Sequence, residues 1–161
     1  MILRPFETFD EENMTVILAD HTVRKTYMLP DFDSPKDAKP LFDRLMGLSK
    51  DNSRFVRCIS LHGQAIGFLN DVEIENGCIE VGYVLSPACH NRGLMTQALE
   101  LAIRELFSLG YKTVVAGAFE ENAASIRVMV KNGMTKMEKE EIIPYRGADH
   151  NCVYYQITNQ E

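Results

Sequence analysis

The first third of the chain shows apolar and polar positions at helical spacing. After a short strand-like run at 2–6, the residues of one face recur three or four positions apart and predict a first helix: Met14, Ile17, Leu18 and His21. A second helix is predicted from Ser34-Pro35, where a cap hydroxyl precedes a proline and Asp37 follows one turn in. Its apolar stripe ends near Gly47.

The spacing becomes strand-like between residues 53 and 85. Three runs with β character follow one another, separated by a turn at Gly63 and by Asn76-Gly77. Because Asn-Gly between strand-like runs is a strong signal for a two-residue hairpin, we expect three antiparallel strands.

Strands and helices alternate in the rest of the chain. The pattern predicts a helix, a strand, a helix and two strands, in that order, at 93–108, 112–119, 123–132, 134–143 and 152–158. The predicted order is therefore β-α-α-β-β-β-α-β-α-β-β. With no repeat or long linker, one domain spanning 1–161 is expected.

Composition excludes several functional classes. The 17 Lys and Arg against 23 Asp and Glu give a net charge of -6, which argues against a general nucleic-acid footprint but permits a local basic groove. The start of the chain lacks a secretory layout and no apolar run is long enough for a membrane, so a cytoplasmic location is expected. The 4 cysteines have no metal-ligand spacing, so we expect free thiols and no metal.

Two joints between a strand and a helix are candidates for a binding site. At the first joint, Pro87, a polar loop and Gly93 precede a helix. The unpaired N–H groups at the start of that helix can bind an anion, and Arg92 adds a positive charge beside them. Taken alone, this loop is explained slightly better by an ordinary strand-to-helix turn that contains a glycine. At the second, Asn122 and Ser125 open a helix directly after a buried-looking strand. Ligands gather at such carboxyl ends of strands.

Several segments together carry a family resemblance. HNRGLMTQAL resembles the pyrophosphate-binding loop of GNAT acetyltransferases, and NAASIRVMVKNGM resembles a second motif of that family. With ILRPFETFD at the start and EVGYVLSP before the loop, the chain is most similar to the RimJ/RimL-like branch, the ribosomal-protein alanine N-acetyltransferases. The resemblance implies the GNAT fold of the α+β class, a three-layer α/β structure whose mixed sheet of about six to seven strands is flanked by helices.

Four positions depart from the family pattern. His90 stands where Gln or Arg is usual, Met95 where Gly or Ala is usual, and Met134 replaces a phenylalanine. Met129 occupies the position where many members carry the tyrosine that protonates the departing thiolate. This chain therefore has to stabilise that thiolate in another way.

The resemblance implies a reaction and the residues that serve it. An amine attacks the thioester of acetyl-CoA directly, and no metal takes part. Backbone groups of Val84 and Leu85 would hold the oxyanion and the pantetheine, while Asn122 and Ser125 would contact the thiol end. The pyrophosphate would lie on the loop residues His90, Asn91, Arg92, Gly93, Leu94, Met95 and Thr96.

Three side chains are candidates for proton transfer. Glu80 shares a strand face with Val84 and is the candidate base, acting through a water, although a solvated glutamate is nearly as common there. Ser125 would donate to the thiolate, or lie on an uninvolved helix surface. Tyr154 would be a secondary proton donor or a substrate wall, or simply pack. Other polar residues are weaker candidates: His62, Asp71, Cys89, Arg127, Lys131 and His150.

The acceptor and the assembly are left open by the sequence. An acetyl-CoA-dependent N-acetyltransferase acting on a protein N-terminus or a small amine is the main interpretation, and the acidic balance suits a cationic acceptor. A non-catalytic acyl-CoA sensor and a nucleotide-binding protein are the alternatives, the latter disfavoured because neither GK[ST] nor a full GxGxxG is present. No nucleic-acid or membrane partner is expected, and the chain would be a monomer or a homodimer.

Overall fold

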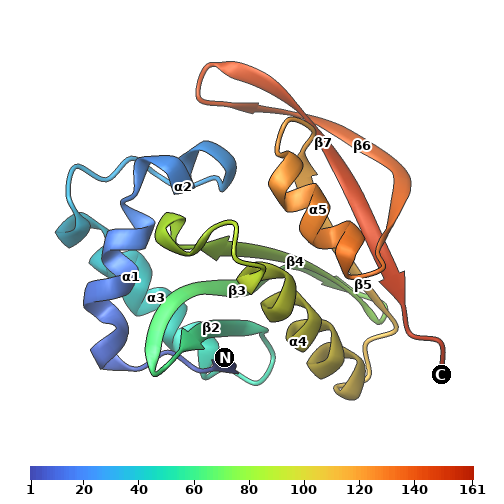
Figure 1. The fold of residues 1–161 in the computed structure, drawn as a ribbon, viewed down its shortest axis with the longest axis horizontal. Helices are drawn as coiled ribbons and strands as arrows, with labels where there is room; N and C mark the ends of the chain where they lie inside the picture. Colours follow the sequence, from blue (N-terminus) through green and yellow to red (C-terminus); the bar gives the residue numbers. More distant parts are fainter.

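The computed structural model describes residues 1–161 and contains one sheet, shown in Figure 1, whose 7 strands follow the order β1-β2-β3-β4-β5-β7-β6. Every neighbouring pair is antiparallel except β4 and β5, which run parallel. The strands are β1 (Ile2–Arg4), β2 (Val56–Leu61), β3 (Gln64–Glu75), β4 (Cys78–Leu85), β5 (Thr113–Phe119), β6 (Thr135–Tyr145) and β7 (Ala148–Thr158). The predicted mixed sheet is confirmed.

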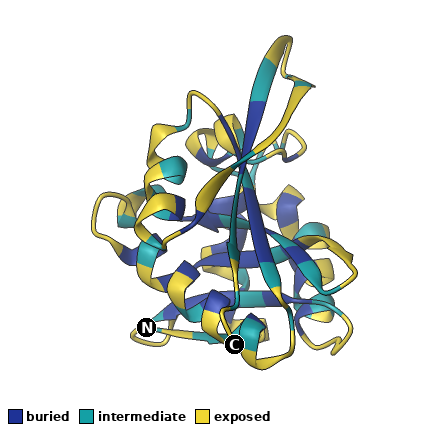
Figure 2. Cartoon of the chain, turned by 90° about the vertical axis from the view of Figure 1, so that its right-hand side faces the viewer, coloured by how far each residue is buried: buried dark blue, intermediate teal, exposed yellow.

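Helices cover both faces of the sheet, as the three-layer prediction required. One apolar cluster joins the first three helices to β2, β3 and Val84 of β4, and a larger one joins the last two helices to the opposite face. Figure 2 shows this burial at the centre of the sheet, with exposed residues on the outer surfaces. The helices are α1 (Glu11–Leu18), α2 (His21–Thr26), α3 (Lys39–Ser49), α4 (Leu94–Ser108) and α5 (Ala123–Lys131).

The predicted first helix is two helices in the structure. The carboxylate of Asp20 accepts hydrogen bonds from the N–H groups of Thr22 (2.7 Å) and Val23 (3.3 Å), so α1 stops at Leu18 and a new helix starts at His21. An aspartate is a strong N-cap, and here that local effect overrides the continuing spacing.

The predicted second helix is largely correct. Ser34 and Asp37 form the expected capping box, although its first turn is a 3-10 turn at Pro35–Ala38. The helix α3 then continues through Gly47 to Ser49, because an isolated glycine weakens a helix without ending it.

The last hairpin extends further than predicted. The turn between β6 and β7 is Arg146-Gly147, with φ of 52° and 77°, so most of the polar segment 144–151 is paired strand. Its tip reaches α2. The hydroxyl of Tyr145 donates to the carbonyl of Arg24 at 2.5 Å, and Arg146 donates to the carbonyl of Leu29 at 3.1 Å. This clamp joins two segments more than a hundred residues apart.

The parallel strands β4 and β5 separate halfway along their length. Their pairing runs from Cys78 with Thr113 to Val81 with Ala116 and then stops. The outer edges stay paired, since β4 continues along β3 and β5 continues along β7 as far as Phe119. A wedge therefore opens in the middle of an otherwise continuous sheet, at the carboxyl ends of both strands.

Gly117 is required beside this wedge because the ring of Tyr154 lies against its backbone. A Cβ at this position would lie 2.8 Å from Cε1 of Tyr154. We expect Gly117→Ala to lower the free energy of unfolding by about 1–3 kcal/mol through overpacking. Thermal denaturation measures this as a lower Tm.

Gly47→Ala is the matched control, because a Cβ there meets nothing within 4 Å and the residue lies inside a helix. It should raise stability by about 0.5–1 kcal/mol. A Gly117→Ala variant as stable as the unmodified chain would contradict the close approach of Tyr154.

Candidate active site

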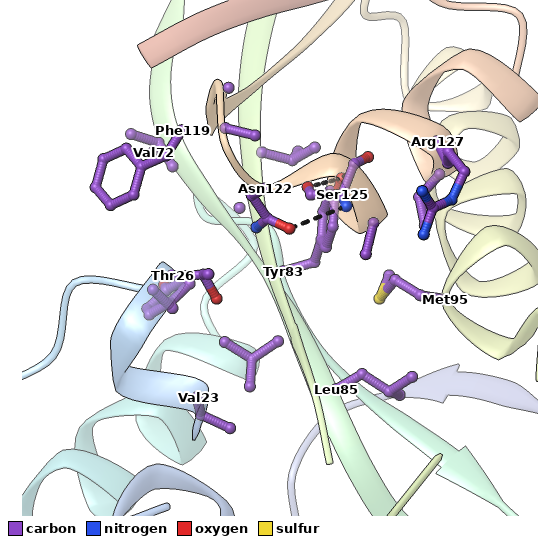
Figure 3. Close-up of a pocket in the computed structure, with 18 of the residues that line it drawn as sticks. Val23, Thr26, Val72, Tyr83, Leu85, Met95, Phe119, Asn122, Ser125 and Arg127 are labelled. Atoms are coloured by element: carbon purple, nitrogen blue, oxygen red, sulfur yellow. Dashed lines mark hydrogen bonds between the residues drawn. The ribbon is translucent and has the colours of Figure 1, made fainter. Parts of the chain in front are cut away.

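The wedge between β4 and β5 opens into the main cleft of the molecule. The cleft has a volume of about 1180 Å³ and is lined from α2, β3, β4, the loop before α4, β5, α5 and the last hairpin. In the close-up of Figure 3, Val23 and Thr26 lie on the α2 side, whereas Met95 and Arg127 lie on the side of α4 and α5. The cleft therefore has two sides that meet at the splayed strands.

Alternation along β4 assigns its residues to one side or the other. Gly82 faces α2, since a Cβ there would lie 3.4 Å from the ring of Tyr27. Glu80 and Val84 share that face. Tyr83 points the other way, to α5, where its hydroxyl meets Ser125 at 2.7 Å. Thus one strand serves both sides of the cleft, which are called below the α2 side and the α5 side.

The loop before α4 presents unpaired backbone donors on the α5 side. Gly93 has φ 72° and Asn91 has φ 60°, a left-handed path that leads directly into the helix. The backbone N–H groups from Asn91 to Thr96 have no acceptor within the protein. Together with the positive end of the helix dipole, these donors suit an anion such as a pyrophosphate.

His90 anchors this loop. Its Nε2 lies 3.0 Å from the carbonyl oxygen of Leu85, so the imidazole ties the loop back to the end of β4. A histidine in place of the usual Gln or Arg therefore has a structural role that the sequence pattern did not reveal.

The cationic side chains that line the cleft near this loop are not the one that the sequence suggested. Arg92 is exposed and its side chain does not line the cleft. Arg127 and Lys131 of α5, considered only weak candidates from the sequence, do line it and make no ion pair. The positive charge on the α5 side thus comes from a helix rather than from the loop.

Ser125 and Asn122 line the α5 side of the cleft at the start of α5. Asn122 caps α5 by accepting a hydrogen bond from the N–H of Ser125 at 3.2 Å, and both residues line the cleft. Met129 is fully buried in the core and Met95 packs against the same cluster. The hydroxyl groups near this end therefore belong to Ser125 and Tyr83.

Tyr83 was not predicted as a site residue. Burial raises the pKa of its phenol to about 12, and the hydrogen bond with Ser125 acts in the opposite direction. The alternation of side chains along the strand could have identified it, because a residue three positions after Glu80 must point to the opposite face of the sheet.

The α2 side carries Glu80 beside the splay. The carboxylate is half-buried and makes no hydrogen bond with another side chain. Burial raises its pKa, the charge of Lys139 opposes this, and repulsion from Glu73 and Glu141 adds to the increase. Such a carboxylate is a stronger base than an exposed one, which suits proton abstraction.

Tyr154 of β7 lines the cleft on the α2 side. Its hydroxyl donates to Oε2 of Glu141 at 3.0 Å, and Nζ of Lys139 lies 4.3 Å from the ring centroid. Burial is the main cause that raises the pKa of its phenol, and the neighbouring Cys152 and Glu141 raise it further. The structure thus places Tyr154 against the cleft with its proton directed to a carboxylate.

The weaker candidates are distributed as follows. Asp71 forms an ion pair with Arg54 at 2.6 Å, and His62 lies in the turn between β2 and β3. His150 stacks on Phe119 with centroids 4.3 Å apart, so it supports the wall of the cleft. Cys89 lines the cleft, and all cysteines are free.

No group of three or more His, Cys, Asp or Glu side chains is arranged to hold a metal ion. None of the helices combines the length and the apolar character needed to cross a membrane.

Splayed parallel strands beside a helix end with unpaired N–H groups fit the acyl-CoA-dependent acyltransferase class that the sequence resemblance implied. Comparison with known families agrees: residues 1–135 match the acetyltransferase (GNAT) domain model. The chain belongs to the GNAT acetyltransferase family and is an acyltransferase, with acetyl-CoA as cosubstrate. No curated protein matches the sequence significantly.

Solved structures show the same fold at low sequence identity. A GNAT-family acetyltransferase from Bacillus anthracis superposes with a TM-score of 0.82 at 24% identity, over 99% of this chain and 95% of that one. A spermidine N-acetyltransferase from Vibrio cholerae, in complex with CoA and spermine, gives 0.80 at 15% identity, over 98% and 94%. RimL, a ribosomal L7/L12 alpha-N-protein acetyltransferase in complex with coenzyme A, gives 0.83 at 19% identity, over 97% and 92%, and is a distant relation.

The unpaired donors of the loop lead to a binding prediction. Gly93→Glu places a carboxylate where the pyrophosphate would meet the N–H groups, so the Kd for acetyl-CoA should rise at least tenfold, or about 1.4 kcal/mol. Isothermal titration calorimetry measures this change.

Gly110→Glu is the matched control, because Gly110 also has a positive φ (99°) and open space but lies beyond the opposite end of α4. It shares the backbone strain and should leave acetyl-CoA binding unchanged. Equal Kd values for the two variants would rule out this loop as the phosphate site.

Proposed function

We propose that this chain transfers the acetyl group of acetyl-CoA directly to a primary amine, without a covalent enzyme intermediate. The proposal is carried by one observation: an unpaired carboxylate, Glu80, and a hydroxyl, Ser125, lie on opposite sides of the same splayed strand. An amine arriving on one side and a thioester on the other would meet where the strands separate.

Binding of the donor would use the α5 side. The N–H groups from Asn91 to Thr96 would hold the pyrophosphate, with Arg127 and Lys131 beside it. The pantetheine would lie along the open edge of β4 near Val84 and Leu85, where pairing with β5 has ended. A backbone N–H on this edge would stabilise the carbonyl oxygen as it becomes negative.

Proton transfer would use both sides. Glu80 would take one proton from the ammonium through a water, leaving the amine free to attack the thioester carbon. The C–N bond forms and the C–S bond breaks, with the electron pair remaining on sulfur. The Ser125 hydroxyl would donate a hydrogen bond to this thiolate, and the second amine proton would pass to solvent or to the sulfur.

We propose a cationic acceptor, because carboxylates outnumber cations on the α2 side. Glu73, Glu80 and Glu141 line it with Lys25 and Lys139, and Lys139 lies 3.6 Å from Glu141. A small amine that carries a second positive charge fits this surface better than a neutral one. The spermine in the complex of the Vibrio cholerae spermidine N-acetyltransferase is an amine of this kind.

Removal of the base tests the reaction. Glu80→Gln should lower kcat by about 10²–10⁴, the usual contribution of general base catalysis. Because burial raises the pKa of Glu80 above its ordinary 4.5, kcat of the unmodified enzyme should fall as pH decreases through that raised value, and Glu80→Gln should lack this acidic limb. Release of free thiol over a pH series measures both effects.

Glu75→Gln provides the control, since Glu75 lies on β3 near the hairpin turn, is exposed and does not line the cleft. It should retain the acidic limb and the rate. A purified protein that binds acetyl-CoA but acetylates no amine would instead support an acyl-CoA sensor.

Charge on the α2 side gives a prediction for acceptor choice. A diamine should have a higher kcat/KM than a monoamine of equal length, and the advantage should decrease as salt screens the carboxylates over a Debye length of about 8–10 Å. Initial rates at low and high ionic strength measure the ratio. A monoamine that performs equally at low salt would contradict the cationic acceptor.

A further inference from the structure

The hydroxyl groups of Tyr83 and Ser125 form a pair on the α5 side. The oxygen atoms Tyr83 Oη and Ser125 Oγ lie 2.7 Å apart, and the same phenol lies 3.2 Å from the carbonyl oxygen of Ser125. No other group in the protein forms a hydrogen bond with the Tyr83 hydroxyl. The phenol has a single proton, so it can donate to only one of these two oxygens at a time.

These alternatives set the direction of the serine proton. When Tyr83 donates to the Ser125 carbonyl, the serine hydroxyl donates its proton to Tyr83 and has none left for a ligand. When Tyr83 donates to Oγ, the serine proton is free to point into the cleft, and its O–H is polarised by the incoming hydrogen bond. Only the second arrangement presents a donor to a sulfur atom.

We propose that Tyr83 is a positioning residue that acts through Ser125, turning the serine hydroxyl toward the departing thiolate and strengthening it as a hydrogen-bond donor. This proposal rests on the acetyl transfer proposed above and assigns to two hydroxyl groups the role for which Met129 has no suitable atom. The C–S bond breaks with its electron pair on sulfur, Ser125 donates to that charge, and Tyr83 donates to Ser125. Both hydroxyl groups keep their protons.

The surroundings of Tyr83 favour this role. The ring lies on the part of β4 that has no partner on the β5 side, so it spans the wedge to reach α5. Burial holds the pKa of the phenol near 12, so it remains a neutral donor throughout the pH range of an enzyme assay. Asn122 fixes the first turn of α5 and therefore the position of Ser125.

The first test needs no turnover. Free coenzyme A is bound to the protein and its thiol is titrated by the ultraviolet absorbance of the thiolate. Two hydrogen-bond donors in series should lower the pKa of the bound thiol below the value of about 8.5 typical of a free thiol. Tyr83→Phe keeps the ring but removes the hydroxyl, and should raise that pKa by about half a unit to one unit.

The second test uses turnover with two donors, acetyl-CoA and its selenoester analogue, whose leaving group is less basic. Tyr83→Phe should lower kcat with acetyl-CoA about tenfold or more while KM for the donor changes little, and the loss should shrink with the selenoester. In a Ser125→Ala background, Tyr83→Phe should cause no further loss, because the two residues act as a unit.

Tyr27→Phe is the matched control. Tyr27 is also a buried tyrosine of the cleft with a pKa raised to about 12, but its hydroxyl donates to Asn70 at 2.8 Å on the α2 side. Any effect of this substitution should be equal for both donors and leave the pKa of bound coenzyme A unchanged.

The outcomes separate the two proposals. A Tyr83→Phe variant with an unchanged thiol pKa, an equal loss with both donors, or an additional loss beside Ser125→Ala would overturn the role of Tyr83 and leave acetyl transfer intact. Failure of the unmodified enzyme to acetylate any amine would overturn the proposed function, even where the thiol titration gives the expected shift.

Discussion

The site depends on the interrupted pairing of two parallel strands. Between Val81 and Leu85, β4 is held by β3 on one edge and by nothing on the other, while β5 is held by β7. Backbone groups that a continuous sheet would pair are thus available to a ligand, without the sheet losing its outer support. The N-terminus of α4 lies beside this opening because the chain leaves β4 through a short turn into the helix.

The same strand keeps two kinds of chemistry apart. Successive side chains of β4 point to opposite faces, so a carboxylate and a hydroxyl a few residues apart never touch. On the α2 side of the cleft the carboxylates outnumber the cations, whereas the α5 side combines unpaired donors with cations. Each side can therefore suit its own ligand, and the reacting atoms need to meet only at the opening between the strands.

Local signals in the sequence predicted much of the fold. Asn76-Gly77 adopts the positive φ values of a tight hairpin, and Gly93 and Asn122 mark the helix starts as expected. The break at Asp20 was missed because the apolar spacing continues across it, although the carboxylate alone restarts the helix. The length of the last hairpin was underestimated because the segment around its turn, 144–151, is mostly polar and largely exposed, which removes the alternation that identifies a strand.

The sequence predicted part of the cleft, both in its backbone and in its side chains. The loop of unpaired N–H groups follows from a glycine before a helix. Glu80, Asn122, Ser125 and Tyr154 were also singled out and do line the cleft. The role of His90 as an anchor, the exposure of Arg92 and the pairing of Tyr83 with Ser125 depend on contacts across the fold. Such contacts leave no periodic trace in a single sequence.

The clamp between the last hairpin and α2 has a consequence for how this architecture diversifies. Part of the wall of the α2 side comes from two segments far apart in the chain, α2 and the last hairpin, which Tyr145 and Arg146 join. The residues that line the α5 side lie in the stretch between these two segments. Insertions or exchanges in the hairpin would therefore reshape the α2 side of the cleft while leaving the loop before α4 and the start of α5 in place.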